Sequence, residues 1–174
     1  MTHRAQFEQW IPARVDTVFL FFANPRNLPR IMPPSSGTKL LDLKLVPPTE
    51  AGNMPFNSAE IASLAGRGSE ITTSFRLLPF LPFRAKWIAR IVEFEWNRYF
   101  ADEQQNGPFK RFHHSHLVAR ETRNGVEGTA LRDVIEYEVG YGFLGRLAGQ
   151  YIVARILQKS FEYRKKAAAK LLVP

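Results

Sequence analysis

The chain contains no cysteine, which excludes disulfide bonds, thiolate catalysis and zinc sites built from thiolates. Histidine and carboxylate side chains are therefore the strong metal ligands that remain. No hydrophobic run is long enough for a transmembrane helix, and the N-terminus, MTHRAQFEQW, lacks the charged and then apolar layout of a secretion signal. Together these absences predict a cytoplasmic protein.

The chain also lacks a concentrated run of one charge. Lys and Arg outnumber Asp and Glu by 24 to 16, for a formal net charge of +8, but the basic residues are dispersed. One short cluster, Arg164 to Lys166, fits the cations that a helix C-terminus attracts through its dipole. The positive charge favours an anionic partner, such as a membrane surface. The alternative is that it serves no partner at all. Without a basic stripe or a recognised module, we expect no nucleic acid partner.

What is present fits one domain, because 174 residues with 45% hydrophobic side chains can bury a sizeable core and no linker or repeat interrupts them. We therefore predict a single domain over residues 1–174. Alternation predicts a first strand at 3–11, and helical spacing predicts two short helices at about 14–23 and 25–32. Residues 47–68 have the composition of a long connection.

Six more strands and a long helix complete the prediction. The strand candidates are 38–46, 69–78, 85–96, 98–105, 109–121 and 128–139. From Leu144 the hydrophobic period becomes helical, which predicts an amphipathic helix ending near Leu172. The fold class is therefore α+β: a curved antiparallel sheet of seven strands, with the long C-terminal helix across its concave face.

Three of the four histidines fall within residues 113–116, inside the strand candidate FKRFHHSHLV. Because alternate side chains of a strand share a face, His114 and His116 point one way and His113 the other. A two-residue turn at Asn124-Gly125 fixes the register with the next strand. Counting back from it pairs His116 with Asp133, His114 with Ile135 and Phe112 with Tyr137. We therefore predict that His114, His116 and Asp133 face inward.

The same alternation, applied to residues 85–96, predicts that Arg90 also faces inward. Two interpretations of these polar groups stay open: they satisfy one another within the core, or they line a cavity and orient the polar end of a bound molecule. The candidate ligand-binding residues are Arg90, Val92, Phe94, Phe112, His114, His116, Asp133, Ile135, Tyr137, Ile152 and Ile156.

The candidates for acid/base catalysis are His114, His116 and Asp133, since a histidine beside a carboxylate in an apolar pocket can be tuned in either direction. Nothing in the sequence identifies a nucleophile. The same three residues could share a metal ion, but His-x-His is common in strands and no second cluster supports a site. We therefore predict neither a metal nor a cofactor.

Loops rich in Pro, Gly and aromatic residues gather at one end of the predicted sheet. They suggest a cavity entrance rimmed by Phe80, Phe83, Phe109, Tyr141 and Phe143. The alternative is that these rings plug the end of the core. The segment 77–83 is also a candidate for transient contact with an anionic membrane, with Arg84 and Lys86 near the headgroups.

Several motifs resemble those of the bacterial cyclase/dehydrase-like branch of the START-like (SRPBCC, Bet v 1-like) superfamily. They are Asn27-Leu28-Pro29-x-Ile31-x-Pro33, Asp102-x-Gln104-x-x-Gly107-Pro108-Phe109-x-x-Phe112-x-His114-x-His116, then Asp133 and Tyr137, and Phe161-x-Tyr163-Arg164. The resemblance implies a helix-grip fold, with seven antiparallel strands around a long C-terminal helix and a hydrophobic cavity between them. Its members bind lipids, sterols, polyketides or hormones, and some are aromatase/cyclases.

The leading hypothesis is a domain that binds a hydrophobic small molecule: a lipid, a polyketide or another aromatic or isoprenoid-like compound. The alternatives are a cyclase or dehydratase that uses the inward His, Asp and Arg groups, and an assembly factor that docks a partner protein through the apolar rim. Fold analogy alone does not choose among them. The sequence predicts neither the oligomeric state nor the identity of the ligand.

Overall fold

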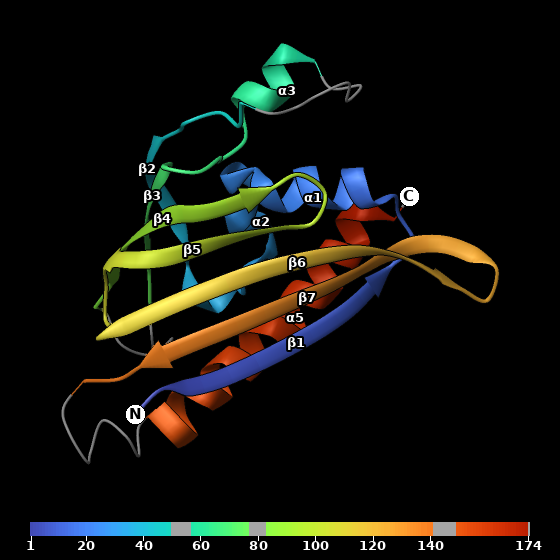
Figure 1. Ribbon diagram of the computed structural model, residues 1–174. Coiled ribbons are helices and arrows are strands. Elements are labelled where there is room, and N and C mark those ends of the chain that lie inside the picture. The colour runs from blue at the N-terminus through green and yellow to red at the C-terminus, as the bar shows by residue number, and fades with distance from the viewer. Residues whose placement is uncertain (50–56, 77–82, 141–148, 174) are drawn as a thin grey trace.

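The computed structural model describes residues 1–49, 57–76, 83–140 and 149–173. Its strands are β1 His3–Ile11, β2 Lys39–Lys44, β3 Glu70–Phe75, β4 Ala85–Glu95, β5 Tyr99–Asn106, β6 Arg111–Arg123 and β7 Val126–Glu138. Its helices are α1 Val15–Ala23, α2 Leu28–Ile31, α3 Ser58–Ala62 and α5 Ala154–Leu172, with 3-10 turns at Pro25–Asn27 and Pro34–Ser36 and a π turn at Gly149–Val153 (Figure 1).

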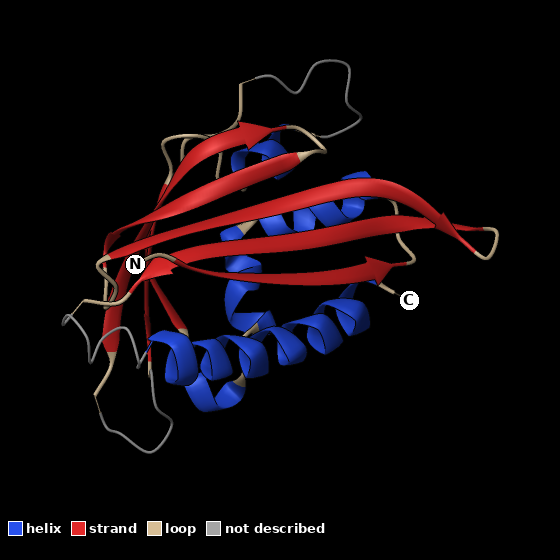
Figure 2. Ribbon diagram, turned by 60° about the horizontal axis from the view of Figure 1, so that its bottom comes forward, coloured by secondary structure: helices blue, strands red, loops and turns tan. Residues whose placement is uncertain are grey.

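The seven strands form one antiparallel sheet in the order β1-β7-β6-β5-β4-β3-β2. Each strand from β2 to β7 pairs with the next along the chain, and β1 closes the far edge by pairing with β7 (Figure 1). The long helix α5 runs along one face of this sheet, where α1 and α2 also lie (Figure 2). The predicted fold class, a helix-grip arrangement of seven strands and a long C-terminal helix, is confirmed.

The tight turn between β6 and β7 sets the register of the strands that carry the histidines. Asn124 and Gly125 both have positive φ, at 50° and 76°, as a two-residue hairpin turn of this hand requires. Arg123 consequently pairs with Val126. The three pairs predicted from this turn are confirmed: Phe112 with Tyr137, His114 with Ile135, and His116 with Asp133.

The prediction that Arg90 faces inward is wrong, because β4 does not alternate regularly. Its pairing with β5 shifts between Ile91 and Glu93, so that Val92 is an extra residue. Before this bulge Ala89 and Ile91 are buried and Arg90 is exposed, and after it Phe94 faces inward. Relative to a regular strand, the extra residue places the residues before it on the opposite face from the one predicted. Nothing in the sequence marks the position of this bulge.

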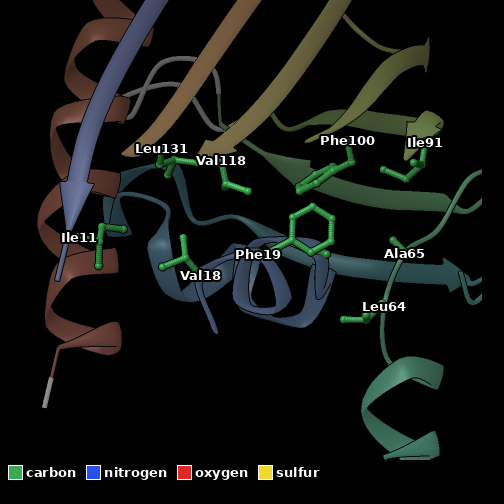
Figure 3. Packing of buried hydrophobic residues seen from close by; sticks show 10 residues of the cluster. Ile11, Val18, Phe19, Leu64, Ala65, Ile91, Phe100, Val118 and Leu131 are labelled. Carbon is green, nitrogen blue, oxygen red and sulfur yellow. The ribbon is translucent and has the colours of Figure 1, made fainter. Parts of the chain in front are cut away.

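The main core packs α1 against the middle of the sheet. Val18 and Phe19 of α1 are fully buried, and the Phe19 ring meets Phe100 edge-on at 5.8 Å (Figure 3). Burying a phenylalanine of this kind contributes about 2 kcal/mol. The helix ends before Asn24-Pro25, as predicted, because proline cannot continue it.

A second core cluster holds α5 on the sheet. Phe161 of α5 is buried and stacks on Phe7 of β1, with 4.2 Å between the ring centroids. Between the two clusters the sheet and the helices are not in full contact, which leaves room for the cavity described below. No helix among the described residues is both long enough and apolar enough to span a membrane.

Candidate functional site

A cavity of about 910 Å³ lies between the concave face of the sheet, the α1–α2 region and the first half of α5. Its wall is mainly apolar and aromatic. The apolar members include Phe21, Phe22, Leu28, Ile31, Met32, Ile71, Phe75, Trp87, Ala89, Ile91, Phe100, Phe109, Phe112, Ile135, Ile152, Val153, Ile156, Leu157 and Phe161. This volume lies in the upper part of the range found for pockets that take small organic molecules.

The structure brings most of the predicted ligand-binding residues to this cavity. Phe112, His114, His116, Ile135, Ile152 and Ile156 line it. Asp133 and Tyr137 are buried on the same face of β7 but lie behind the lining. Because of the bulge, Arg90 and Val92 do not reach the cavity, and Phe94 packs in the main core against Phe19 instead.

The predicted entrance is only partly described. Phe109 lines the cavity, where its ring meets Trp87 at 5.7 Å. Phe83 is 77% exposed and does not line it. Phe80, Tyr141 and Phe143 lie outside the described residues. The role of these residues as a rim therefore stays a prediction.

A buried polar cluster interrupts the apolar wall. His114 and His116, on β6, and Asp133, on β7, are each 6–7% exposed. The Nε2 atom of His114 is 3.0 Å from Asp133 Oδ1, and the Nδ1 atom of His116 is 2.6 Å from the same oxygen. The second contact is short but poorly aligned for a hydrogen bond.

Asp102 on β5 adds a second carboxylate. It pairs across the strands with His114, and its Oδ2 atom is 3.7 Å from His114 Nδ1. Burial raises the pKa of Asp102, while the charges of His114 and Arg164 oppose the shift. The candidate residues named from the sequence did not include Asp102, although it opens the motif that carries the family resemblance.

The cation of the site comes from α5, not from β4. Arg164 lines the cavity, with its guanidinium 4.5 Å from the centre of the Phe161 ring. Burial lowers the pKa of Arg164, and Asp133 and Asp102 oppose this. The sequence did carry a signal for this placement: Arg164 is three residues after the apolar Phe161 and so shares its helix face.

The environment separates the protonation states of the cluster. Burial lowers the pKa of His114 to about 4, with a further contribution from His116, so His114 is neutral near neutral pH. Burial alone would raise the pKa of Asp133, but the His116 charge and the hydrogen bond from His114 outweigh it and hold that pKa well below its usual range. Asp133 is therefore an ionised carboxylate that accepts a hydrogen bond from Nε2 of His114 and lies against Nδ1 of His116.

His113 takes no part in this cluster. It faces the other side of β6, as predicted, where its ring nitrogens lie 3.3 Å from Glu103 Oε1 and 3.1 Å from Ser115 Oγ. This outward histidine offers a matched control for substitutions of the inward pair.

The seven-stranded grip around a long helix, with a cavity between them, is the helix-grip fold that the motifs predicted. Residues 11–159 match the family described as "Polyketide cyclase / dehydrase and lipid transport", and the chain belongs to this family. No curated protein matches the chain in sequence. The family resemblance read from the motifs is thus confirmed.

Solved structures of low sequence identity share the fold. The protein TTHA0849 from Thermus thermophilus is 14% identical, with a TM-score of 0.63, over 98% of this chain and 97% of that one. A START superfamily protein from Mycobacterium smegmatis is 12% identical, with a TM-score of 0.60, over 98% and 97%. Norcoclaurine synthase from Thalictrum flavum is 14% identical, with a TM-score of 0.61, over 99% and 87%.

Proposed function

We propose that this protein binds a hydrophobic small molecule, such as a lipid, a polyketide or another aromatic or isoprenoid-like compound, in the cavity between the sheet and α5. The observation that carries the proposal is the cavity itself: about 910 Å³ with a mainly apolar wall and a buried polar cluster. Such a wall takes up the apolar body of a ligand, while the few polar groups fix its orientation.

The polar cluster favours a second candidate, a cyclase or dehydratase acting on a polyketide-like substrate. His116 and Asp102 both line the cavity, within reach of a bound molecule, and Asp133 orients His116 from behind. A neutral histidine beside a carboxylate can take a proton from a carbon next to a carbonyl group, or return one to a leaving hydroxyl. The carrier and enzyme hypotheses thus share one site and differ in whether the ligand leaves unchanged.

The proposal includes a transient contact with an anionic membrane surface, from which a lipophilic ligand would be collected. Its support is local: Phe83 is 77% exposed beside Arg84 and the exposed Lys86. An apolar ring flanked by cations suits the boundary between headgroups and acyl chains. Docking of a partner protein on the same apolar segment is the remaining alternative.

The test compares what co-purifies with the native protein and with two substituted forms. Ala89→Phe adds a ring at a small, buried residue of the cavity wall, whereas Arg90→Phe adds the same ring on the outer face of the same strand. After organic extraction and mass spectrometry, we expect a lipophilic compound from the wild type and from Arg90→Phe, and much less from Ala89→Phe.

A fluorescent probe tests the same cavity without knowledge of the ligand. We expect 8-anilinonaphthalene-1-sulfonate to bind the extracted wild type and Arg90→Phe alike, and Ala89→Phe at least threefold more weakly, because the added ring takes up part of the space and of the apolar wall that the probe contacts. Equal binding by all three proteins, together with an empty extract, would reject the cavity as a ligand site.

A further inference from the structure

The wall of the cavity carries three ligand-type side chains whose inner atoms find no hydrogen bond among the described residues. They are the Asp102 carboxylate, Nδ1 of His114 and Nε2 of His116. All three residues line the cavity, so a bound species has access to them.

The opposite edges of both imidazoles face one carboxylate. Asp133 Oδ1 is 3.0 Å from Nε2 of His114 and 2.6 Å from Nδ1 of His116. An ionised oxygen at these distances requires a proton on each facing nitrogen. In the neutral imidazole the other nitrogen then carries a lone pair. The lone pairs therefore lie on Nδ1 of His114 and Nε2 of His116, away from Asp133.

This tautomer assignment places a lone pair of His114 toward a second carboxylate. Nδ1 of His114 is 3.7 Å from Oδ2 of Asp102, too far for a hydrogen bond. A lone pair and a carboxylate oxygen at this distance repel each other unless a proton or a metal cation lies between them. One ligand atom from each of Asp102, His114 and His116 lies within 4.8 Å of the other two.

We propose that Asp102, His114 and His116 bind one divalent first-row transition metal ion, with Asp133 orienting both histidines. Two histidines and one carboxylate form a facial set that leaves coordination positions open, which suits Fe²⁺ or Zn²⁺. A carboxylate that accepts a hydrogen bond from the far side of a metal-bound histidine is the usual supporting group of such sites. Since all three ligands line the cavity, an ion held by them would be reached from it.

The charges around the site accommodate a dication. A metal ligand must be deprotonated, so in the bound state Asp102 and Asp133 carry two negative charges and Arg164 one positive charge, which with neutral histidines leaves one net negative charge to meet the ion. Bonds of about 2.1 Å in a tetrahedral arrangement place ligand atoms about 3.4 Å apart. The most distant ligand atoms, which are within 4.8 Å, therefore draw together on binding.

The site goes beyond the binding of an apolar molecule and does not depend on it. An ion at this position would polarise a carbonyl oxygen of whatever occupies the cavity, as a Lewis acid does. Sequence reasoning considered His114, His116 and Asp133 as a ligand set, but the structure gives the third position to Asp102 and places Asp133 behind the histidines.

The experiment titrates Co²⁺ into protein that has been stripped with EDTA and freed of extractable lipid. We expect one equivalent to give the visible absorption of Co²⁺ held by nitrogen and oxygen ligands, and Zn²⁺ to displace it. Asp102→Asn and His116→Gln should each weaken binding at least tenfold. His113→Gln, an outward change on the same strand, should bind like the wild type.

Two results would overturn the proposal: no Co²⁺ absorption in the wild type, or wild-type affinity in both Asp102→Asn and His116→Gln. Should the variants fail to fold, paramagnetic shifts in wild-type Co²⁺ protein decide, because they must be centred on the rings of His114 and His116. Binding of the fluorescent probe, measured in EDTA, reports the apolar cavity separately, so either conclusion can fail alone.

Discussion

At the scale of single residues, Asp133 is the group on which the polar cluster depends. Its carboxylate faces both inward histidines, and its pKa is held low by His116 and His114 against the effect of burial. Buried charges are tolerated where partners surround them, and removing one partner leaves the others uncompensated. Asp133 therefore fixes the orientation of His114 and His116 in addition to any role toward a ligand.

We expect Asp133→Asn to lower the free energy of unfolding by about 2 kcal/mol, since it replaces an ionised acceptor by a weaker neutral one without changing volume. Urea unfolding in the presence of EDTA, followed by circular dichroism, measures the change. Glu136→Gln makes the same chemical change on the exposed face of β7 and should stay within about 0.5 kcal/mol of the wild type. Equal values for the two variants would show that the cluster is not held through Asp133.

The inward histidines and Asp133 could be predicted because a short turn with its own sequence signature fixes the β6–β7 register. Asp102 and Arg164 could not be placed in the same way. Asp102 meets His114 through the β5–β6 pairing, whose longer connection fixes no register from sequence. Arg164 shares a helix face with Phe161, which the sequence does show, but its place beside the carboxylates depends on how α5 packs on the sheet.

At the scale of the elements, the alternation and the periodicity located all seven strands and the long helix, but not the two faces of β4. Each strand is a local pattern, whereas the bulge at Val92 depends on pairing with β5. Because of this bulge, the cavity wall contains Ala89 and Ile91 in place of the predicted Arg90. The shape of the cavity thus depends on a pairing irregularity that the sequence does not show.

The junction of β1 and β7 depends on one glycine. A Cβ atom at Gly128 would lie 2.6 Å from the Ile11 carbonyl oxygen and 2.6 Å from the Trp10 ring. Trp10 cannot easily move, because its Nε1 donates a hydrogen bond to the Glu121 carbonyl oxygen at 3.1 Å. Gly128→Ala should therefore force β1 away from β7.

For Gly128→Ala we expect a loss of about 1–3 kcal/mol in the free energy of unfolding. Amide hydrogen exchange should localise the effect to β1 and to the facing part of β7. Gly140→Ala is the matched control, because a Cβ atom there meets no described atom within 4 Å and the residue has no positive φ. If exchange in β1 is unchanged in Gly128→Ala, the close approach does not constrain the edge of the sheet.

At the scale of the whole molecule, a net charge of +8 spread over the chain combines with an apolar residue held out from the surface. Phe83 is 77% exposed, and the next residue anchors the chain beside it. The Arg84 guanidinium donates to the Gly37 carbonyl oxygen at 2.6 Å and to the Ser74 carbonyl oxygen at 2.8 Å. An aromatic side chain has few rotatable bonds and so loses little conformational entropy on entering a membrane surface.

We expect the wild-type protein to float with phosphatidylserine-containing vesicles and Phe83→Ser to float at least threefold less, because the ring supplies apolar burial and the net charge supplies attraction. Raised salt should weaken the flotation of the wild type and of Phe83→Ser, because it screens the attraction between the protein and the anionic vesicles. Val126→Ser is the control: it removes a half-exposed apolar residue from the β6–β7 turn, which lies at the opposite end of the sheet from the β3–β4 connection. Equal flotation of both variants would mean that charge alone holds the protein at the surface, and the ligand would then have to reach the cavity through water.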